Sequence, residues 1–324
     1  MKKLREIGIL SVALLTIVSA GFSALANAAN ANGYKVSPVR TDLVIEPGTS
    51  KTFSVFIQNV SGNSENLQVL INDFGPTTSE TGQPALLLNG QEAPSHGLKQ
   101  YITIPNGPIS LQSNEQKSVK VQISIPKDAP GGGYYGAIRF APAGAAGDKN
   151  VNLSASVASL VLVKVPGQIT EKLSIASFDV RSGDSPSVVF TNHKGLQAVV
   201  RFQNSGDVQE EPFGKIQLKK GSTILSTTEI NNTDPRGNVL PDSVRRFSVS
   251  LDKLGSFGKY TVVGNFGYGS SGQLLSAKTT FYIIPLFAII IVAAAILFIL
   301  FLIFVLPRWI RAYDRRVVRR ANRR

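Results

Sequence analysis

The stretch PKDAPGGGYYGAIRFAP, residues 126–142, decides the fold because its glycine run has two opposite interpretations. A phosphate-binding loop needs a strand before it and a helix after it, so that backbone N–H groups and the helix dipole face the anion. After these glycines the side chains instead alternate as in a strand, and no Lys-Ser or Lys-Thr pair follows. One face would carry Tyr134, Gly136, Ile138 and Phe140, and the other Tyr135, Ala137 and Arg139. The stretch therefore predicts a turn that leads into a strand.

The start of this strand is similar to the tyrosine corner of immunoglobulin-like sandwiches, in which a Tyr hydrogen-bonds back to the preceding corner. We expect Gly133 to lie in the turn, Tyr134 to pin it and Gly136 to enter the core. The segment GKYTVV, residues 258–263, repeats the pattern and places Tyr260 at a second corner.

Alternation of apolar and polar residues recurs along the chain, as at Val119, Val121 and Ile123, and turn residues separate the runs. Period two over short segments predicts half-buried strands of an antiparallel sandwich. The second half repeats the first, because VFIQN at 55–59 has its counterpart in VRFQN at 200–204. We therefore predict an all-β fold of two tandem immunoglobulin-like β-sandwiches, residues 33–166 and 168–282, plus one C-terminal transmembrane α-helix. Residues 73–100 interrupt the first pattern and would hold either a small hairpin or a binding loop.

The two ends of the chain predict export and anchoring. Residues 1–28 combine a basic start, an apolar core and small residues at a cleavage site, as in a signal peptide, with an uncleaved anchor as the alternative. Residues 283–306 contain no charge and, at ~1.5 Å per residue, span about 36 Å, enough to cross a membrane. The tail, residues 307–324, should stay in the cytoplasm, which leaves the sandwiches outside in a single-pass cell-membrane protein. Its basic residues include Arg308, Arg311, Arg315, Arg316, Arg319 and Arg320.

The charge balance does not indicate nucleic-acid binding. The leader holds 3 basic residues and Glu6, and the tail holds 8 arginines and Asp314, so 23 basic and 19 acidic residues remain, a net charge of +4. The tail itself is either a topology determinant or a contact for anionic membrane lipids.

No pattern in the sequence predicts catalysis, a metal or a cofactor. The chain has no cysteine, and its two histidines, His96 and His193, lie in separate polar loops. Ser270 lies in a hairpin turn without the spacing of a nucleophile elbow. The adjacent Glu210 and Glu211 are interpreted as surface charge. We therefore predict that the protein is not an enzyme.

The whole layout resembles the WxL-interacting proteins of bacterial cell surfaces. The likeness is carried by VSPVRTDLVIEPG at 36–48 and by the segment at 101–140, with its Pro-x-x-Ala-Pro-Gly and Tyr-Tyr-Gly-Ala-Ile motifs. The resemblance implies a peptidoglycan-binding domain followed by a host-binding domain, and contact with WxL-domain proteins. The resulting hypothesis is a surface scaffold or adhesion protein that binds wall polymer or other surface proteins. The alternative is a structural or sensory subunit of a membrane complex that acts through its span and basic tail.

Overall fold

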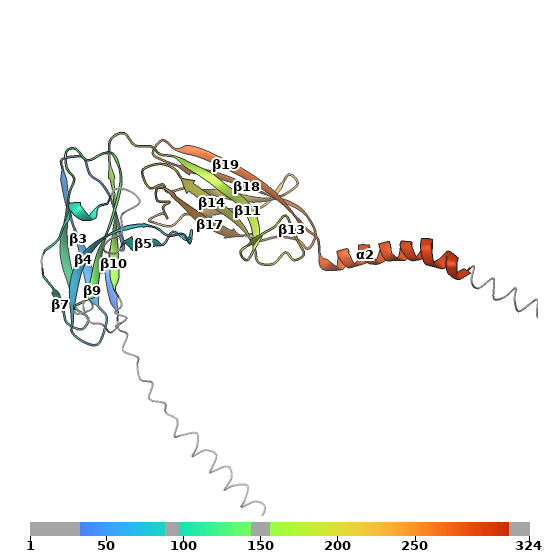
Figure 1. The fold of residues 1–324 in the computed structure, drawn as a ribbon, viewed down its shortest axis with the longest axis horizontal. Coiled ribbons are helices and arrows are strands. Elements are labelled where there is room, and N and C mark those ends of the chain that lie inside the picture. Colours follow the sequence, from blue (N-terminus) through green and yellow to red (C-terminus); the bar gives the residue numbers. More distant parts are fainter. Residues whose placement is uncertain (1–32, 88–96, 106, 144–155, 311–324) are drawn as a thin grey trace, which may run out of the picture.

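The computed structural model describes residues 33–87, 97–105, 107–143 and 156–310. These residues form two β-sandwiches followed by a helix (Figure 1). The strands of the first sandwich run across the direction of those in the second, and the helix leaves from the end of the second sandwich that is farther from the first. The predicted signal peptide and the tail beyond residue 310 lie outside the described residues.

The first sandwich has one sheet of four strands and one of six. The four-stranded sheet has the order β1 (Tyr34–Ser37), β3 (Ser50–Asn59), β8 (Gln116–Ser124) and β6 (Ile102–Thr103). The other has the order β2 (Arg40–Val44), β10 (Val157–Val165), β9 (Gly132–Pro142), β4 (Glu65–Pro76) and β5 (Pro84–Leu87), and β7 (Ile109–Leu111) also pairs with β4.

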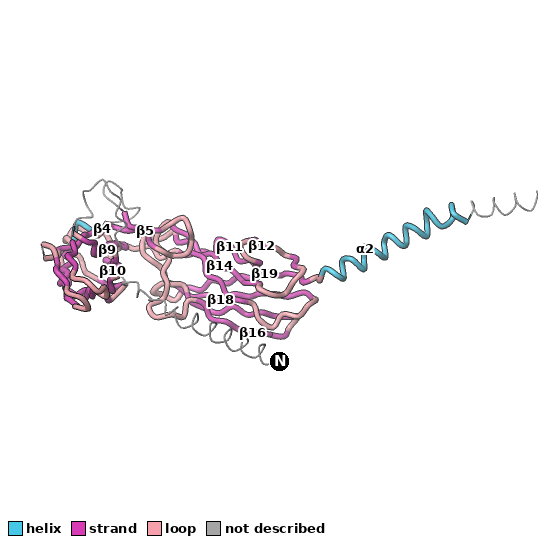
Figure 2. The backbone as a smooth tube through the Cα atoms, turned by 90° about the horizontal axis from the view of Figure 1, so that it is seen from below, coloured by secondary structure: helices cyan, strands magenta, loops and turns pink. Residues whose placement is uncertain are grey.

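The second sandwich has the same plan. It lies between the first sandwich and the C-terminal helix (Figure 2). One sheet has the order β12 (Ser185–Pro186), β11 (Leu173–Ser182), β14 (Leu196–Asn204) and β17 (Ser243–Ser250). The other has the order β13 (Val189–Phe190), β19 (Gln273–Ile283), β18 (Gly258–Tyr268), β15 (Phe213–Lys220) and β16 (Thr223–Ile230). In each sandwich a short strand pairs in parallel with the last long one, β2 with β10 and β13 with β19, while the other strand pairs are antiparallel. The predicted fold class of two tandem sandwiches and one C-terminal helix is confirmed.

A buried asparagine explains why the Gln-Asn ending recurs. Asn59 ends β3 and Asn204 ends β14, and they are 0% and 1% exposed. The Asn204 amide donates to the carbonyls of Val208 and Val239 at 2.7 and 2.9 Å, and its oxygen accepts the N–H of Gly206 at 2.9 Å. Asn59 makes the equivalent contacts in the first sandwich. Each side chain therefore satisfies the backbone of a turn that the interior would otherwise leave unpaired.

The alternating residues face inward as predicted. Ile138 and Phe140 of β9 lie in the first core with Val119 and Val121 of β8, and all four are buried. The second core is more aromatic, and Phe202 meets Phe266 edge to face at 5.1 Å between ring centroids. Each sandwich thus closes on an apolar core of its own.

The excursion at residues 73–100 begins as a hairpin. β4 extends to Pro76, turns and returns as β5, which pairs with it from Asp73 to Pro76. Figure 1 shows this hairpin reaching from the first sandwich toward β14 and β17 of the second. Residues 88–96, which include His96, lie outside the described residues.

The chain passes from the second sandwich into the helix within two residues. Ile283 still pairs with Gly258 in the sheet, and α2 runs over Leu286–Leu300, followed by a π-helical turn at Phe301–Val305. Pro285, in extended conformation, occupies the N-cap, so the helix begins after the expected residue 283. The segment Leu286–Ile310 is long and apolar enough to cross a membrane by length and composition.

Candidate functional site

The tyrosine corners are packing features. The Tyr134 hydroxyl donates to the carbonyl of Pro130 at 2.9 Å, and the ring is 2% exposed in the first core. In the second sandwich the Tyr260 hydroxyl accepts the N–H of Gly255 at 2.9 Å. A Cβ on Gly136 would come within 2.9 Å of Ile102, so a larger residue here would displace neighbouring core side chains. Neither corner presents a group to solvent.

The glycine run lies where the two sandwiches meet. A Cβ on Gly131 would lie 3.0 Å from the Cα of Gly167 in the linker, so the two backbones are in close contact. The Gly133 N–H donates to the carbonyl of Asp207, at 2.8 Å, and a Cβ there would lie 2.0 Å from the Tyr135 hydroxyl. The run therefore permits a close approach of backbone from the other domain as well as a turn.

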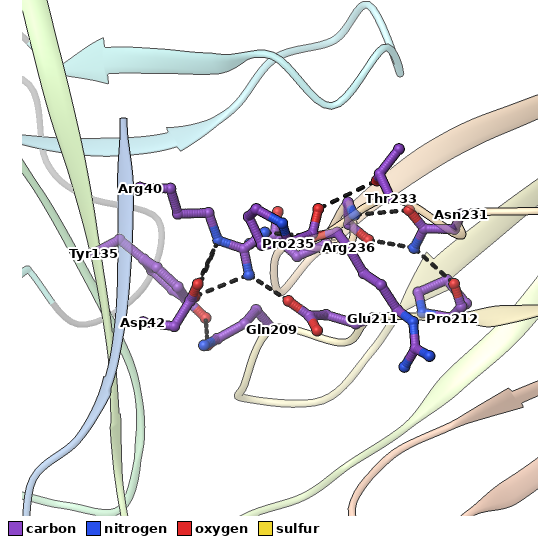
Figure 3. Close-up of polar contacts among 12 residues, drawn as sticks. Arg40, Asp42, Tyr135, Gln209, Glu211, Pro212, Asn231, Thr233, Pro235 and Arg236 are labelled. Carbon is purple, nitrogen blue, oxygen red and sulfur yellow. Dashed lines mark hydrogen bonds and ion pairs between the residues drawn. The ribbon is translucent and has the colours of Figure 1, made fainter. Parts of the chain in front are cut away.

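The second face of β9 is buried against the second sandwich. Tyr135 is 1% exposed, and its hydroxyl donates to Gln209 Oε1 at 3.0 Å (Figure 3). Burial raises the pKa of this hydroxyl far above its ordinary value. The ring packs with Phe74, Ala137 and Leu162, and Leu240 of the second sandwich completes this cluster. The second sandwich thus covers the part of this broad face that carries Tyr135 and Leu162.

Arg40 joins the domains at one side of this cluster. Its guanidinium donates to Asp42 of its own strand, to Glu211 of the second sandwich and to the carbonyl of Arg236 (Figure 3). Asn231 fixes the loop that holds Arg236, because its amide donates to the carbonyl of Gly237 at 2.6 Å and its oxygen accepts the Gly237 N–H at 2.7 Å. The junction is therefore charged at its rim and apolar at its centre.

The β4–β5 hairpin contacts the second sandwich on the side of the apolar cluster opposite Arg40. Both carboxylate oxygens of Glu80 accept hydrogen bonds from Arg201 of β14, and its carbonyl accepts the N–H of Arg246 at 2.8 Å. The hydrogen bond from Arg201 lowers the pKa of Glu80. These contacts fix the two sandwiches relative to each other.

A cleft of about 680 Å³ opens beside Arg40 between the domains. Glu210 lines it and is only 3% exposed, so its interpretation as surface charge is wrong. Its backbone exchanges hydrogen bonds with Val239, at 3.0 and 2.7 Å, which holds the residue inside the junction. Its Oε1 has no hydrogen-bond partner among the described residues, and burial raises its pKa to about 7. An adjacent pair of acids in a polar loop gives no sign of this burial.

The free broad face of the first sandwich is the outer face of β1, β3, β8 and β6. The strand registers place 13 side chains on it, of which 7 carry hydroxyls and 3 carry amides, and none is acidic. The remaining three are Phe56, which is 40% exposed, Lys35 and Lys120. A groove of about 460 Å³ crosses the β1 side of this face, and Phe56, Val39 and Gln58 line it. The hydroxyl and amide residues are Ser37, Ser50, Thr52, Ser54, Gln58, Thr103, Gln116, Ser118, Gln122 and Ser124.

These surfaces are suited to binding polar molecules. Hydroxyl and amide side chains both donate and accept hydrogen bonds, and an exposed aromatic ring offers an apolar surface to a sugar.

Among the described residues no group of three or more His, Cys, Asp or Glu could hold a metal ion. Arg308 lies near the end of the C-terminal helix and donates to the carbonyl of Phe304 at 3.3 Å. The other predicted tail arginines, Arg311, Arg315, Arg316, Arg319 and Arg320, lie outside the described residues.

Comparisons with solved structures include bacterial chaperones of low sequence identity. The E. coli chaperone DraB is 13% identical, with 78% of this chain and 97% of that chain covered and a TM-score of 0.34. The Pseudomonas aeruginosa CupB2 chaperone is 11% identical, with coverages of 75% and 98% and a TM-score of 0.34. At these values the likeness carries no argument about function.

The sequence comparisons are more specific. A search of curated proteins found no match. Residues 41–142 match the family described as WxL Interacting Protein, peptidoglycan binding domain, and this range runs from β2 to the end of β9. The family predicted from the sequence is therefore confirmed over residues 41–142, which match the peptidoglycan binding domain of the WxL-interacting proteins.

Proposed function

We propose that this protein is a non-enzymatic, membrane-anchored surface scaffold that binds peptidoglycan through its first β-sandwich. The observation that carries the proposal is the family match over residues 41–142, which falls on a sandwich whose free face is rich in hydroxyl and amide groups. The proposed division is residues 33–166 for the wall-binding domain and residues 168–282 for a second domain that holds it away from the membrane.

The outer face of β1, β3, β8 and β6 is the surface we assign to the glycan. The opposite broad face is partly covered, because Tyr135 and Leu162 pack against Leu240 of the second sandwich. Phe56 can lie against the apolar face of a sugar ring, while the neighbouring hydroxyls and amides exchange hydrogen bonds with its polar groups. Lys35 and Lys120 can pair with carboxylates of the wall polymer, and no acidic side chain on this face opposes them.

The position of the helix supports anchoring. It begins three residues after β19 ends, so the second sandwich would lie close to the membrane surface. The first sandwich lies at the opposite end of the molecule (Figure 1), which would place the wall-binding face away from the membrane. In the proposed topology the sandwiches are extracytoplasmic, and the arginine-rich C-terminus is cytoplasmic, where it contacts anionic lipids.

A scaffold needs a second partner besides the wall. We propose that WxL-domain surface proteins fill this role, on the strength of the family match alone. The junction supports a scaffold function, because the contacts of Glu80 and Arg40 across it would transmit the position of the wall-bound domain to the second sandwich.

The test is retention of the full chain, in detergent, on purified peptidoglycan sacculi. Phe56→Ala should bind about tenfold more weakly, because a half-exposed aromatic ring contributes ~1–2 kcal/mol on contact with a ligand. The matched control is Phe257→Ala, which removes a ring that is 65% exposed on the second sandwich and should leave retention unchanged. Failure of the wild-type chain to bind sacculi would refute the proposed function. Equal loss in both variants would refute the assigned face.

A further inference from the structure

We propose that the cleft between the two sandwiches binds a primary ammonium group of the peptidoglycan stem peptide, with the Glu210 carboxylate as its acceptor. This inference rests on the proposed function and adds a second point of contact to it. It begins from Glu210 Oε1, a buried carboxylate oxygen without a hydrogen-bond partner in the described part of the chain.

An unpaired buried carboxylate oxygen is unfavourable, because it has lost water without gaining a donor. The Glu210 backbone is held inside the junction, because its N–H and its carbonyl both pair with Val239. Glu210 lines the adjoining cleft of about 680 Å³, and because Oε1 itself is closed to solvent, the carboxyl group must turn toward the cleft to meet a donor there. An ammonium group fits best, because it carries three donors and a positive charge.

The charges that line the cleft also favour a cation. Five acidic residues line it and only two basic ones, Lys164 and Arg236. Most of these groups already have partners. Arg40 donates hydrogen bonds to Asp42 and Glu211, and Lys164 and Ser270 donate to Glu171. Glu210 and Asp234 remain without an ion pair among the described residues, so the cleft offers two carboxyl groups that an ammonium ligand could pair with.

The cleft and the glycan groove lie along the same edge of the first sandwich. Val39, directly before β2, lines the groove, and Asp42 of β2, three residues further along the chain, lines the cleft. Three residues of extended strand span ~10 Å, a distance that one polymer segment can bridge. Asp42, Leu43 and Val44 belong to the family-matched range, so the peptidoglycan binding domain forms one wall of the cleft.

Binding of an ammonium group should be linked to proton release. The groups that face Glu210 are Glu171 and Lys164 from the first sandwich and linker, Glu211 beside it and the backbone of Gly269. Burial keeps Glu210 protonated up to about pH 7, and an ammonium ligand favours the ionised form. The affinity for the amine should therefore rise as the pH increases from 6 to 8.

The experiment compares retention of the full chain, in detergent, on untreated sacculi and on sacculi whose free amines have been acetylated with acetic anhydride. Wild-type retention should weaken about tenfold on acetylated sacculi, the factor expected from one charge-assisted hydrogen bond. Glu210→Gln, which keeps the shape of the side chain, should bind both preparations equally, and its binding should not change between pH 6 and pH 8. The matched control is Glu229→Gln, at an exposed glutamate on β16, which should retain the wild-type preference and pH dependence.

The outcomes separate this inference from the proposed function. Strong and equal binding of the wild-type chain to both preparations would overturn the ammonium site and leave peptidoglycan binding intact. The same would follow if Glu210→Gln kept the full preference for free amines, because the amine would then be recognised elsewhere. Absence of wild-type binding to either preparation would overturn the proposed function itself.

Discussion

The two buried asparagines give the most direct test of the repeated architecture. Replacing Asn204 with Ala removes three hydrogen bonds of 2.7 to 2.9 Å and leaves the backbone groups of Gly206, Val208 and Val239 without this partner. At ~1 kcal/mol for each bond, the free energy of unfolding should fall by about 3 kcal/mol. Because Asn59 makes the equivalent set in the first sandwich, Asn59→Ala should have a similar cost there.

Thermal unfolding and hydrogen exchange measure this cost and locate it. A loss of about 3 kcal/mol corresponds to ~10 °C in the midpoint of a domain of this size. Backbone amide hydrogen exchange should become faster around residues 107–125 in Asn59→Ala and around residues 232–251 in Asn204→Ala. The matched control is Asn265→Ala, at an exposed position of β18, with a loss below ~0.5 kcal/mol. A loss as small as this in either buried variant would refute the structural role of the repeated asparagine.

Three further predictions concern the corner and the junction. Tyr134→Phe should lower the free energy of unfolding by ~1 kcal/mol, through loss of the bond to Pro130, and leave anion binding unchanged, which denaturant titration and phosphate titration check. Gly133→Ala should cost about 2 kcal/mol, because its Cβ would lie 2.0 Å from the Tyr135 hydroxyl, and protease should then cleave the linker faster. Because Arg201 lowers the pKa of Glu80, the stability from this pair should be complete above pH 4.5, the ordinary pKa of Glu, and decrease as the pH falls through the folded value. In Glu80→Gln the free energy of unfolding should therefore depend less on pH below 4.5 than in the wild-type chain.

Much of the fold could be predicted from local pattern. Alternation identified the strands, and the two Gln-Asn endings identified the repeat, because each domain needs the same buried amide at the end of the same strand. The corner tyrosines were found because Tyr134 contacts a carbonyl only four residues away. Contacts between residues that are close in the chain can be recognised from the local sequence.

The junction could not be predicted in the same way, because its contacts join residues far apart in the chain. Tyr135 meets Gln209, 74 positions away, and Arg201 meets Glu80 across 121 positions. One signal was available in β9, whose second face carries Tyr135 and Ala137 where a solvated face would be polar. A strand that is apolar on both faces indicates burial on both. The buried state of Glu210 depends on the docked domains, so its place between Gln209 and Glu211 gives no indication of it.

The central claim, that the first sandwich holds peptidoglycan on its outer face, is tested most directly by photo-crosslinking. Phe56 is replaced by p-benzoylphenylalanine in the full chain, and Phe257 is replaced in a parallel control. After irradiation on sacculi and muramidase digestion, mass spectrometry should find a muropeptide attached to the peptide that contains position 56 and none at position 257. Retention of the protein on sacculi without attachment at position 56, or with equal attachment at both positions, would contradict the account.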